Sequence, residues 1–152
     1  MAGRRSDPGG RTVAQAMLSI PWTHSPVATV AEVAEFFADE HVHAALIINA
    51  AGYLIAVVER ADIAVGAAPD VPAVRLGQLD GRTVQASTAL AEAHEAMLAA
   101  RRRRAAVISP NGRLLGLLCL KASGTGFCSD QDVLERGQES GPGSLNRAGR
   151  VR

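Results

Sequence analysis

The stretch THSPVATVAEVAEFFADEHVHAALIINAAGYLIAVVERADI, residues 23–63, decides the fold of this protein. Thr29, followed three residues later by Glu32, forms the capping-box pattern that starts a helix, because each side chain can satisfy a backbone amide of the other residue. The apolar residues that follow recur at the spacing of one helix face. They are Val30, Val33, Ala34 and Phe37. The pattern predicts an amphipathic helix of about three turns.

Two apolar runs follow this helix and predict a pair of strands. Residues 44–48 form the first run and residues 53–58 the second, with a turn between them that ends at Gly52. Residues 59–65 then predict a short helix, which Gly66 terminates. With a short strand ahead of the first helix, the unit is expected to run strand, helix, strand, strand, helix.

The same succession occurs twice along the chain. A displacement of 60 positions superposes identical residues without a gap, and apolar character agrees at many positions between them. The second copy predicts a short strand at 83–84, a helix capped by Thr88, and two strands around the turn 109–112. The helix residues expected to face the core are Leu90, Ala93 and Met97. The identical pairs are Thr23/Thr83, Ala31/Ala91, Glu32/Glu92, Glu35/Glu95, Ala45/Ala105, Ile48/Ile108, Gly52/Gly112 and Leu54/Leu114.

We expect a mixed α/β (α+β) fold of two βαββα repeats that pack through their sheets as a pseudo-two-fold module, because each sheet has an apolar face that one small unit covers poorly. The predicted boundaries are 12–66 for the first repeat, 67–73 for a linker and 74–123 for the second repeat. Residues 1–11 are expected to be mobile. The glycine-rich segment 124–152 is expected to be mostly disordered.

A short lead-in helix is expected ahead of each repeat, at residues 13–18 and 74–79. Each of these segments precedes the first strand of its own repeat in the sequence.

The composition restricts the classes of partner and activity. The formal charge of +1 gives no overall field toward nucleic acid or an anionic membrane, and 3% aromatic residues leave little surface for base stacking. The spacing of Cys119 and Cys128 permits a disulfide. The two cysteines are nevertheless expected to be reduced thiols in a soluble cytoplasmic protein, because no apolar signal segment follows the first residues. No nucleophile lies in a pattern with a candidate base, and no metal-ligand set is complete. We therefore expect neither an enzyme nor a metal site.

Residues 12–123 resemble a tandem pair of cystathionine-β-synthase (CBS) domains, the arrangement called a Bateman module. The resemblance rests on an ordered combination: Thr23-x-x-Pro26 before a capped helix, an apolar strand, a turn ending in glycine, and a second strand that enters a helix. It implies a regulatory module with two clefts between the repeats, which in this family often hold AMP, ADP, ATP or S-adenosylmethionine. It also implies that such pairs form homodimers.

The resemblance assigns ribose binding to the start of the last helix of a repeat, where the family has a Ser or Thr followed three residues later by an Asp. Asp62 matches the acid, whereas Glu59 replaces the hydroxyl donor. An ionised Glu59 would repel a phosphate, an effect that Arg60 could offset. In the second repeat Cys119 and Ala122 stand at these positions, so the second cleft lacks both groups.

Two functions are consistent with these residues. In the first, an adenosine-containing ligand binds in one cleft through Asp62, backbone groups near Thr23 and Ala45, and a phosphate contact from the run Arg101–Arg104, with Arg103 as the candidate. In the second, Asp62 caps its own helix, the arginines complement a helix end, and the protein is a ligand-free dimerisation or docking module. The regulated partner protein is unknown in both cases.

Overall fold

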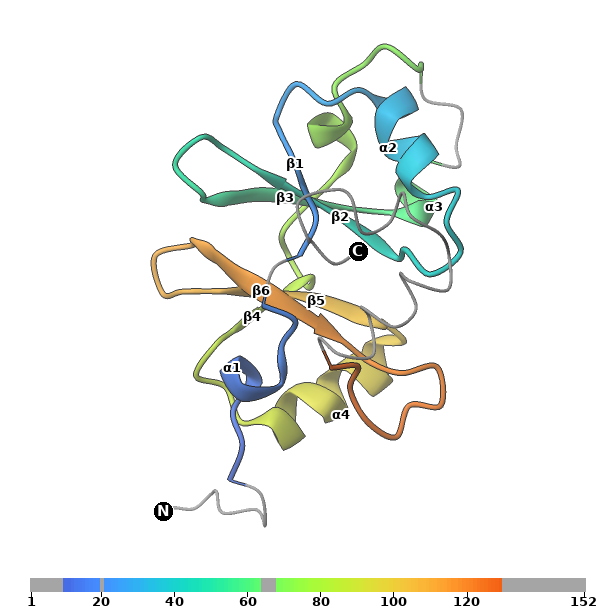
Figure 1. Ribbon diagram of the computed structural model, residues 1–152. Helices are drawn as coiled ribbons and strands as arrows, with labels where there is room; N and C mark the ends of the chain where they lie inside the picture. Colours follow the sequence, from blue (N-terminus) through green and yellow to red (C-terminus); the bar gives the residue numbers. More distant parts are fainter. Residues whose placement is uncertain (1–9, 20, 64–67, 130–152) are drawn as a thin grey trace.

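Two three-stranded sheets lie face to face in the centre of the molecule, with helices on the outer side of each (Figure 1). The structure is a computed structural model, and it describes residues 10–19, 21–63 and 68–129. No helix in these segments is long and apolar enough to cross a membrane. The mixed α/β class and the packing through the sheets are both confirmed.

The first repeat has the predicted order of elements. Its capping box is present, because the Thr29 backbone amide donates to Glu32 Oε1 at 2.8 Å and the Glu32 amide donates to Thr29 Oγ1 at 3.2 Å. β1 runs parallel to β2, and β2 runs antiparallel to β3. The elements are β1 (Thr23–His24), α2 (Val30–Phe36), β2 (Ala44–Ile48), β3 (Leu54–Glu59) and α3 (Arg60–Ile63). The remainder of the helix predicted over 59–65 lies outside the described residues.

Strands β2 and β3 are buried on both faces, which explains why they read as continuous apolar runs. Ala45 and Ile47 point into a core shared with α2, while Leu46 points into a core shared with the second sheet. The alternation follows from the period of two along a strand. One sheet therefore serves two cores.

The second repeat has the same strand pairings, with β4 parallel to β5 and β5 antiparallel to β6. Its elements are β4 (Thr83–Gln85), α4 (Leu90–Ala100), β5 (Arg104–Ile108) and β6 (Leu114–Cys119). In α4, Ala93 and Met97 are buried as predicted and Leu90 packs half-buried beside them.

The predicted cap of α4 is wrong. The helix begins after Ala89, which has no side-chain cap, and Thr88 belongs to the preceding turn, where its amide donates to the Gln85 carbonyl. The Leu90 amide instead donates to the carbonyl of Arg11 at 2.8 Å. A backbone group from a distant segment thus satisfies an amide that the sequence pattern assigned to a local side chain.

The lead-in segments α1 (Val13–Ala16) and η1 (Ala73–Leu76), a 3-10 helix, are exchanged between the repeats. Val13 is buried beside Met97 of α4, and Ala73 is buried in the core of α2. The backbone bridges obey the 60-residue repeat: Leu18 pairs with Leu117 and Gln78 with Val57, while Thr12 pairs with Ala89 and Pro72 with Thr29. The predicted boundaries describe the sequence repeats, whereas in space each lead-in completes the other repeat.

Glycines permit this exchange at its closest points. A Cβ atom on Gly116 would lie 2.6 Å from the Leu18 carbonyl oxygen, and one on Gly77 would lie 2.9 Å from the Val57 carbonyl oxygen. Both separations are shorter than real Cβ contacts. Only a residue without a side chain lets the backbones approach this closely.

The two hairpin turns meet at the pseudo-two-fold axis. Gly52 and Gly112 both have positive φ, and their carbonyls accept from the amides of Leu114 and Leu54, each at 3.0 Å. Tyr53 pairs with Arg113, the residue 60 positions later, in an antiparallel bridge. The expected pseudo-symmetry is therefore present at the level of single hydrogen bonds.

The second repeat ends differently from the first, because β6 is followed by a turn and not by a helix within the described residues. The Lys121 amide donates to the Gly126 carbonyl, and the chain returns alongside β6 so that Cys128 is 3% exposed. Cys128 and the half-buried Phe127 are therefore packed against the second repeat, although the segment from 124 onward is expected to be mostly disordered. Residues 130–152, like the expected mobile segment up to residue 9, lie outside the described residues.

Candidate functional site

Asp62 lies in the first turn of α3, directly after the end of β3. Its Oδ2 atom accepts a hydrogen bond of 2.8 Å from the backbone amide of Glu59. An amide at a helix start has no partner within the helix, and a carboxylate there also complements the helix dipole. The helix-capping role considered for Asp62 is confirmed.

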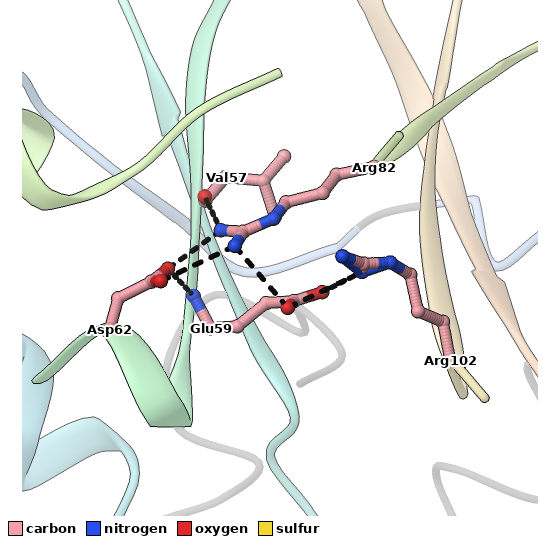
Figure 2. A network of polar contacts seen from close by, with 5 residues as sticks. All are labelled: Val57, Glu59, Asp62, Arg82 and Arg102. Carbon is pink, nitrogen blue, oxygen red and sulfur yellow. Dashed lines mark hydrogen bonds and ion pairs between the residues drawn. The ribbon is translucent and has the colours of Figure 1, made fainter. Parts of the chain in front are cut away.

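Arg82, which precedes β4 in the second repeat, reaches across to the same carboxylate (Figure 2). Its Nη1 atom donates to Asp62 Oδ2 at 2.6 Å and its Nη2 atom to Oδ1 at 3.3 Å. Nη1 also donates to the Val57 carbonyl at 2.7 Å. The residue is 7% exposed, so a buried, two-pronged ion pair joins the two repeats. The sequence analysis did not identify Arg82.

Glu59 is also paired with arginines of the second repeat. Arg102 Nη1 lies 3.1 Å from Glu59 Oε2, and Arg82 Nη2 lies 3.5 Å from Oε1. Figure 2 shows the two carboxylates of the first repeat facing the two guanidinium groups of the second. The repulsion of phosphate expected from Glu59 is thus offset by Arg102 and Arg82.

The site holds both members of the inner pair in their charged forms. Burial raises the pKa of Asp62, but the hydrogen bond from Arg82, the hydrogen bond from the Glu59 amide and the charges of Arg82 and Arg102 outweigh it, so the pKa is lowered. The hydrogen bond to Asp62 in turn raises the pKa of Arg82 against the opposing effect of burial. Asp62 and Arg82 therefore both stay ionised across the physiological range.

Arg60 does not take the position expected of it. Its guanidinium donates to the carbonyls of Phe37 at 2.6 Å and Val42 at 2.5 Å and lies over the Phe37 ring at 5.2 Å. A cation that binds the last carbonyls of a helix also complements its dipole. Arg60 thus closes the end of α2 instead of neutralising Glu59.

The expected backbone contacts, Thr23 and Ala45, lie on neighbouring strands. Thr23 pairs with Leu46 across β1 and β2, is half-buried, and lines a cavity of about 500 Å³ bounded by β1 and α2. Ala45 is fully buried in the core beneath α2. Its side chain therefore has a packing role, and a ligand contact there would use the backbone.

The arginine run divides into separate roles. Arg101 ends α4 in the left-handed conformation, with φ of 58°, and Arg104 donates to the His41 carbonyl at 3.0 Å. Arg103 Nε donates to the Leu120 carbonyl at 3.4 Å. Arg102 is the member of the run that contacts Glu59, and the phosphate contact expected of Arg103 stays a prediction.

The neighbouring His43 has a pKa that is lowered to about 4. Desolvation by burial is the largest cause, followed by the charges of Arg104 and Arg103, and Arg60 and His41 add smaller effects. The imidazole is therefore neutral at physiological pH.

The second cleft lacks the counterpart of this network. Cys119 is buried in the core between the sheets, and Ala122 is exposed in the turn after β6. The repeat displacement relates Arg82 to Trp22, whose ring lies 6.4 Å from that of Phe36 in the first repeat. The ion-pair site is thus present once in the described part of the chain.

Comparison with known proteins rests on solved structures. No protein-family model matches the chain, and no curated protein sequence matches it either.

Three similar structures illustrate the likeness. The CBS pair domain of a putative Mg²⁺ transporter from Shewanella oneidensis is 30% identical over 75% of this chain and 66% of its own, with a TM-score of 0.59. A CBS domain protein from Pyrobaculum aerophilum, complexed with AMP, is 26% identical over 72% of this chain and 87% of its own, with a TM-score of 0.61. A putative acetoin utilization protein from Vibrio cholerae, 19% identical, shares the fold over 87% of this chain and 98% of its own, with a TM-score of 0.63.

These structures share the arrangement found here, in which two small sheets with outer helices pack face to face. The likeness agrees with the repeats read from the sequence and with their pseudo-two-fold pairing. The chain is therefore a tandem pair of cystathionine-β-synthase domains.

Proposed function

We propose that this CBS pair is a regulatory module that binds an adenine nucleotide at the junction of its repeats, beside Asp62. One observation carries the proposal: the Asp62 carboxylate and two arginines of the opposite repeat, Arg82 and Arg102, lie in one contiguous network. A ribose needs an acceptor for its hydroxyl groups, and phosphates need guanidinium donors. The AMP complex of the Pyrobaculum CBS protein supports this ligand class.

Binding would exchange partners within the network. Asp62 Oδ1 accepts a long bond of 3.3 Å from Arg82 and has capacity for a further donor, such as a ribose hydroxyl. The phosphate would compete with Glu59 for Arg102, whose side chain is 27% exposed. Glu59, 25% exposed, can turn toward solvent. Because Arg82 and Arg102 come from the second repeat, such an exchange would change how the repeats are held together.

The ligand class follows from the charges. AMP, ADP and ATP offer the phosphate that the arginines can pair with, whereas S-adenosylmethionine carries a sulfonium cation and no phosphate. We expect the three nucleotides to bind and S-adenosylmethionine to bind more weakly.

Calorimetric titration and thermal unfolding with these four compounds test the proposal. Arg102→Gln should weaken nucleotide binding by about tenfold to a hundredfold, the effect of losing one hydrogen bond to a charged group. Arg101→Gln is the matched control, because Arg101 is exposed and adjacent in sequence. A flat response to all four compounds at millimolar concentration, or equal effects of both substitutions, would contradict the proposal.

A second candidate function is a ligand-free dimerisation or docking module. The observation that favours it is the closure of the network itself, since Asp62 and Glu59 already have arginine partners. In that case no nucleotide should bind, and Arg102→Gln should lower only the free energy of unfolding. The binding partner would then be a protein. Sedimentation velocity tests the homodimer that both functions predict.

The cytoplasmic location also remains a prediction, which cell fractionation tests.

A further inference from the structure

The two cysteines face each other on neighbouring antiparallel segments. The Leu120–Phe127 bridge is flanked by two hydrogen bonds of 2.8 Å, one from the Lys121 amide to the Gly126 carbonyl and one from the Cys128 amide to the Cys119 carbonyl. This pattern makes Cys119 and Cys128 directly opposite partners.

Both thiol side chains point to the same side of the sheet. Cys119 is 0% and Cys128 3% exposed, and both belong to the core between the two sheets, where Leu117 and Leu18 also pack. Opposite residues that exchange a backbone hydrogen bond in an antiparallel pair have Cα atoms about 5.5 Å apart. That separation lies within the range found in disulfides, so a bond between these residues requires little backbone movement.

We propose that Cys119 and Cys128 are a redox-sensitive pair that forms an intramolecular disulfide when the protein meets a two-electron oxidant of the peroxide class. Neither cysteine is part of a disulfide in the structure. One thiolate attacks a peroxide oxygen, so that an S–O bond forms, the O–O bond breaks, and hydroxide leaves and takes up a proton. The second thiol then attacks the sulfenic sulfur, so that the S–S bond forms and the oxygen leaves as water with that thiol's proton. The peroxide is reduced and the two thiols are oxidised.

The position of the pair gives the bond a structural consequence. In the first repeat α3 follows β3, whereas in the second repeat the segment 121–128 folds back beside β6. A disulfide would tie this segment to the end of β6 and close a ten-residue loop. The oxidised form should therefore resist both thermal unfolding and local opening of this edge.

The test uses the full chain, reduced and then treated with hydrogen peroxide. Trypsin cleaves after Lys121, between the cysteines, so a disulfide joins the peptides 114–121 and 122–136 until a thiol reductant separates them. We expect the two joined peptides to come from the same chain. We also expect a rise of the unfolding midpoint by about 5–10 °C that the reductant reverses. Cys128→Ala, which leaves Cys119 as the single cysteine of the chain, should show neither effect.

Other products would overturn the proposal. These are two thiols that both remain open to alkylation after peroxide treatment and unfolding, sulfinic or sulfonic acids in place of the joined peptides, or a disulfide between two chains. Joined peptides without any rise of the unfolding midpoint would refute the proposed stabilisation of the segment 121–128 by the disulfide. The peptide measurement does not depend on any variant folding.

Discussion

Removal of the Asp62 carboxylate should leave the buried Arg82 without its two-pronged partner. This is the strongest stability effect expected from the site. In Asp62→Ala, Arg82 remains 7% exposed and loses its two-pronged partner. Removing one member of a buried ion pair costs about 3–5 kcal/mol. Asp62 is 19% exposed, and Arg82 keeps the Val57 carbonyl and the Glu59 carboxylate, so the cost should fall below that range, at about 2–3 kcal/mol. Loss of the cap on the Glu59 amide adds about 1 kcal/mol.

Urea unfolding at neutral pH measures this effect. A total of about 3–4 kcal/mol should lower the midpoint by about 1.5–2 M at a slope of about 2 kcal/mol/M, with the slope unchanged. Asp70→Ala, at an exposed acid, is the matched control and should change the free energy of unfolding by less than about 0.5 kcal/mol. An Asp62→Ala midpoint equal to that of Asp70→Ala would refute the reasoning.

A double-mutant cycle separates the ion pair from the cap. Arg82→Met removes the cation while keeping apolar bulk, so the double variant Asp62→Ala/Arg82→Met should lose less stability than the sum of the single variants. The coupling should be about 1–3 kcal/mol, as for residues in direct contact. Additive effects would show that Asp62 acts through its helix cap alone.

The pH dependence has a definite sign. The folded-state pKa of Asp62 is lowered, with burial opposing and the bonds from Arg82 and the Glu59 amide outweighing it. The stabilisation is therefore complete above the unfolded-state pKa of about 3.9 and is lost as the pH falls through the lower folded value. The difference in unfolding free energy between the wild type and Asp62→Ala should shrink below about pH 4.

Three further outcomes follow from local geometry. Gly116→Ala places a methyl group 2.6 Å from the Leu18 carbonyl and should cost about 1–3 kcal/mol in urea unfolding, whereas Gly126→Ala, with open space around it, should be close to neutral. His43, with a pKa of about 4, should stay neutral at pH 5.5 by NMR; a titration midpoint near 6.5 would contradict the cationic surroundings assigned to it. Arg60→Ala should lower the free energy of unfolding by about 1–3 kcal/mol, because the part-buried carbonyls of Phe37 at the end of α2 and of Val42 before β2 lose their donor; an unchanged urea midpoint would count against this role.

Short-range patterns in the sequence predicted most of the fold. The capping box at Thr29, the apolar runs and the turn glycines each act within a few residues, and the structure has the corresponding elements in the predicted order. The same reasoning failed at Thr88, because α4 begins one residue later and takes its amide partner from the carbonyl of Arg11. A local rule has no information about a partner that is distant in sequence.

The candidate site was predicted in part. The resemblance to CBS domains singled out Asp62 as the ribose acid and placed Glu59 at the position of the hydroxyl donor, and the arginine run was identified as a source of a phosphate contact. The phosphate contact assigned to Arg103 stays a prediction, and the structure brings its neighbour Arg102 to Glu59. A period-two alternation along the approach to β5 would have separated Arg102 from Arg103, but it does not say which of them faces the first repeat.

The sequence by itself determined that this protein is built from two similar repeats and which strands and main helix each repeat contains, because spacing and turn chemistry encode these features locally. The family was indicated by the resemblance of those repeats to CBS domains. The tertiary structure alone decided that the lead-in segments are exchanged and that Arg82 meets Asp62. Those contacts join residues twenty to a hundred positions apart. They form only when the two sheets pack face to face and the lead-in backbones approach β3 and β6 closely at Gly77 and Gly116.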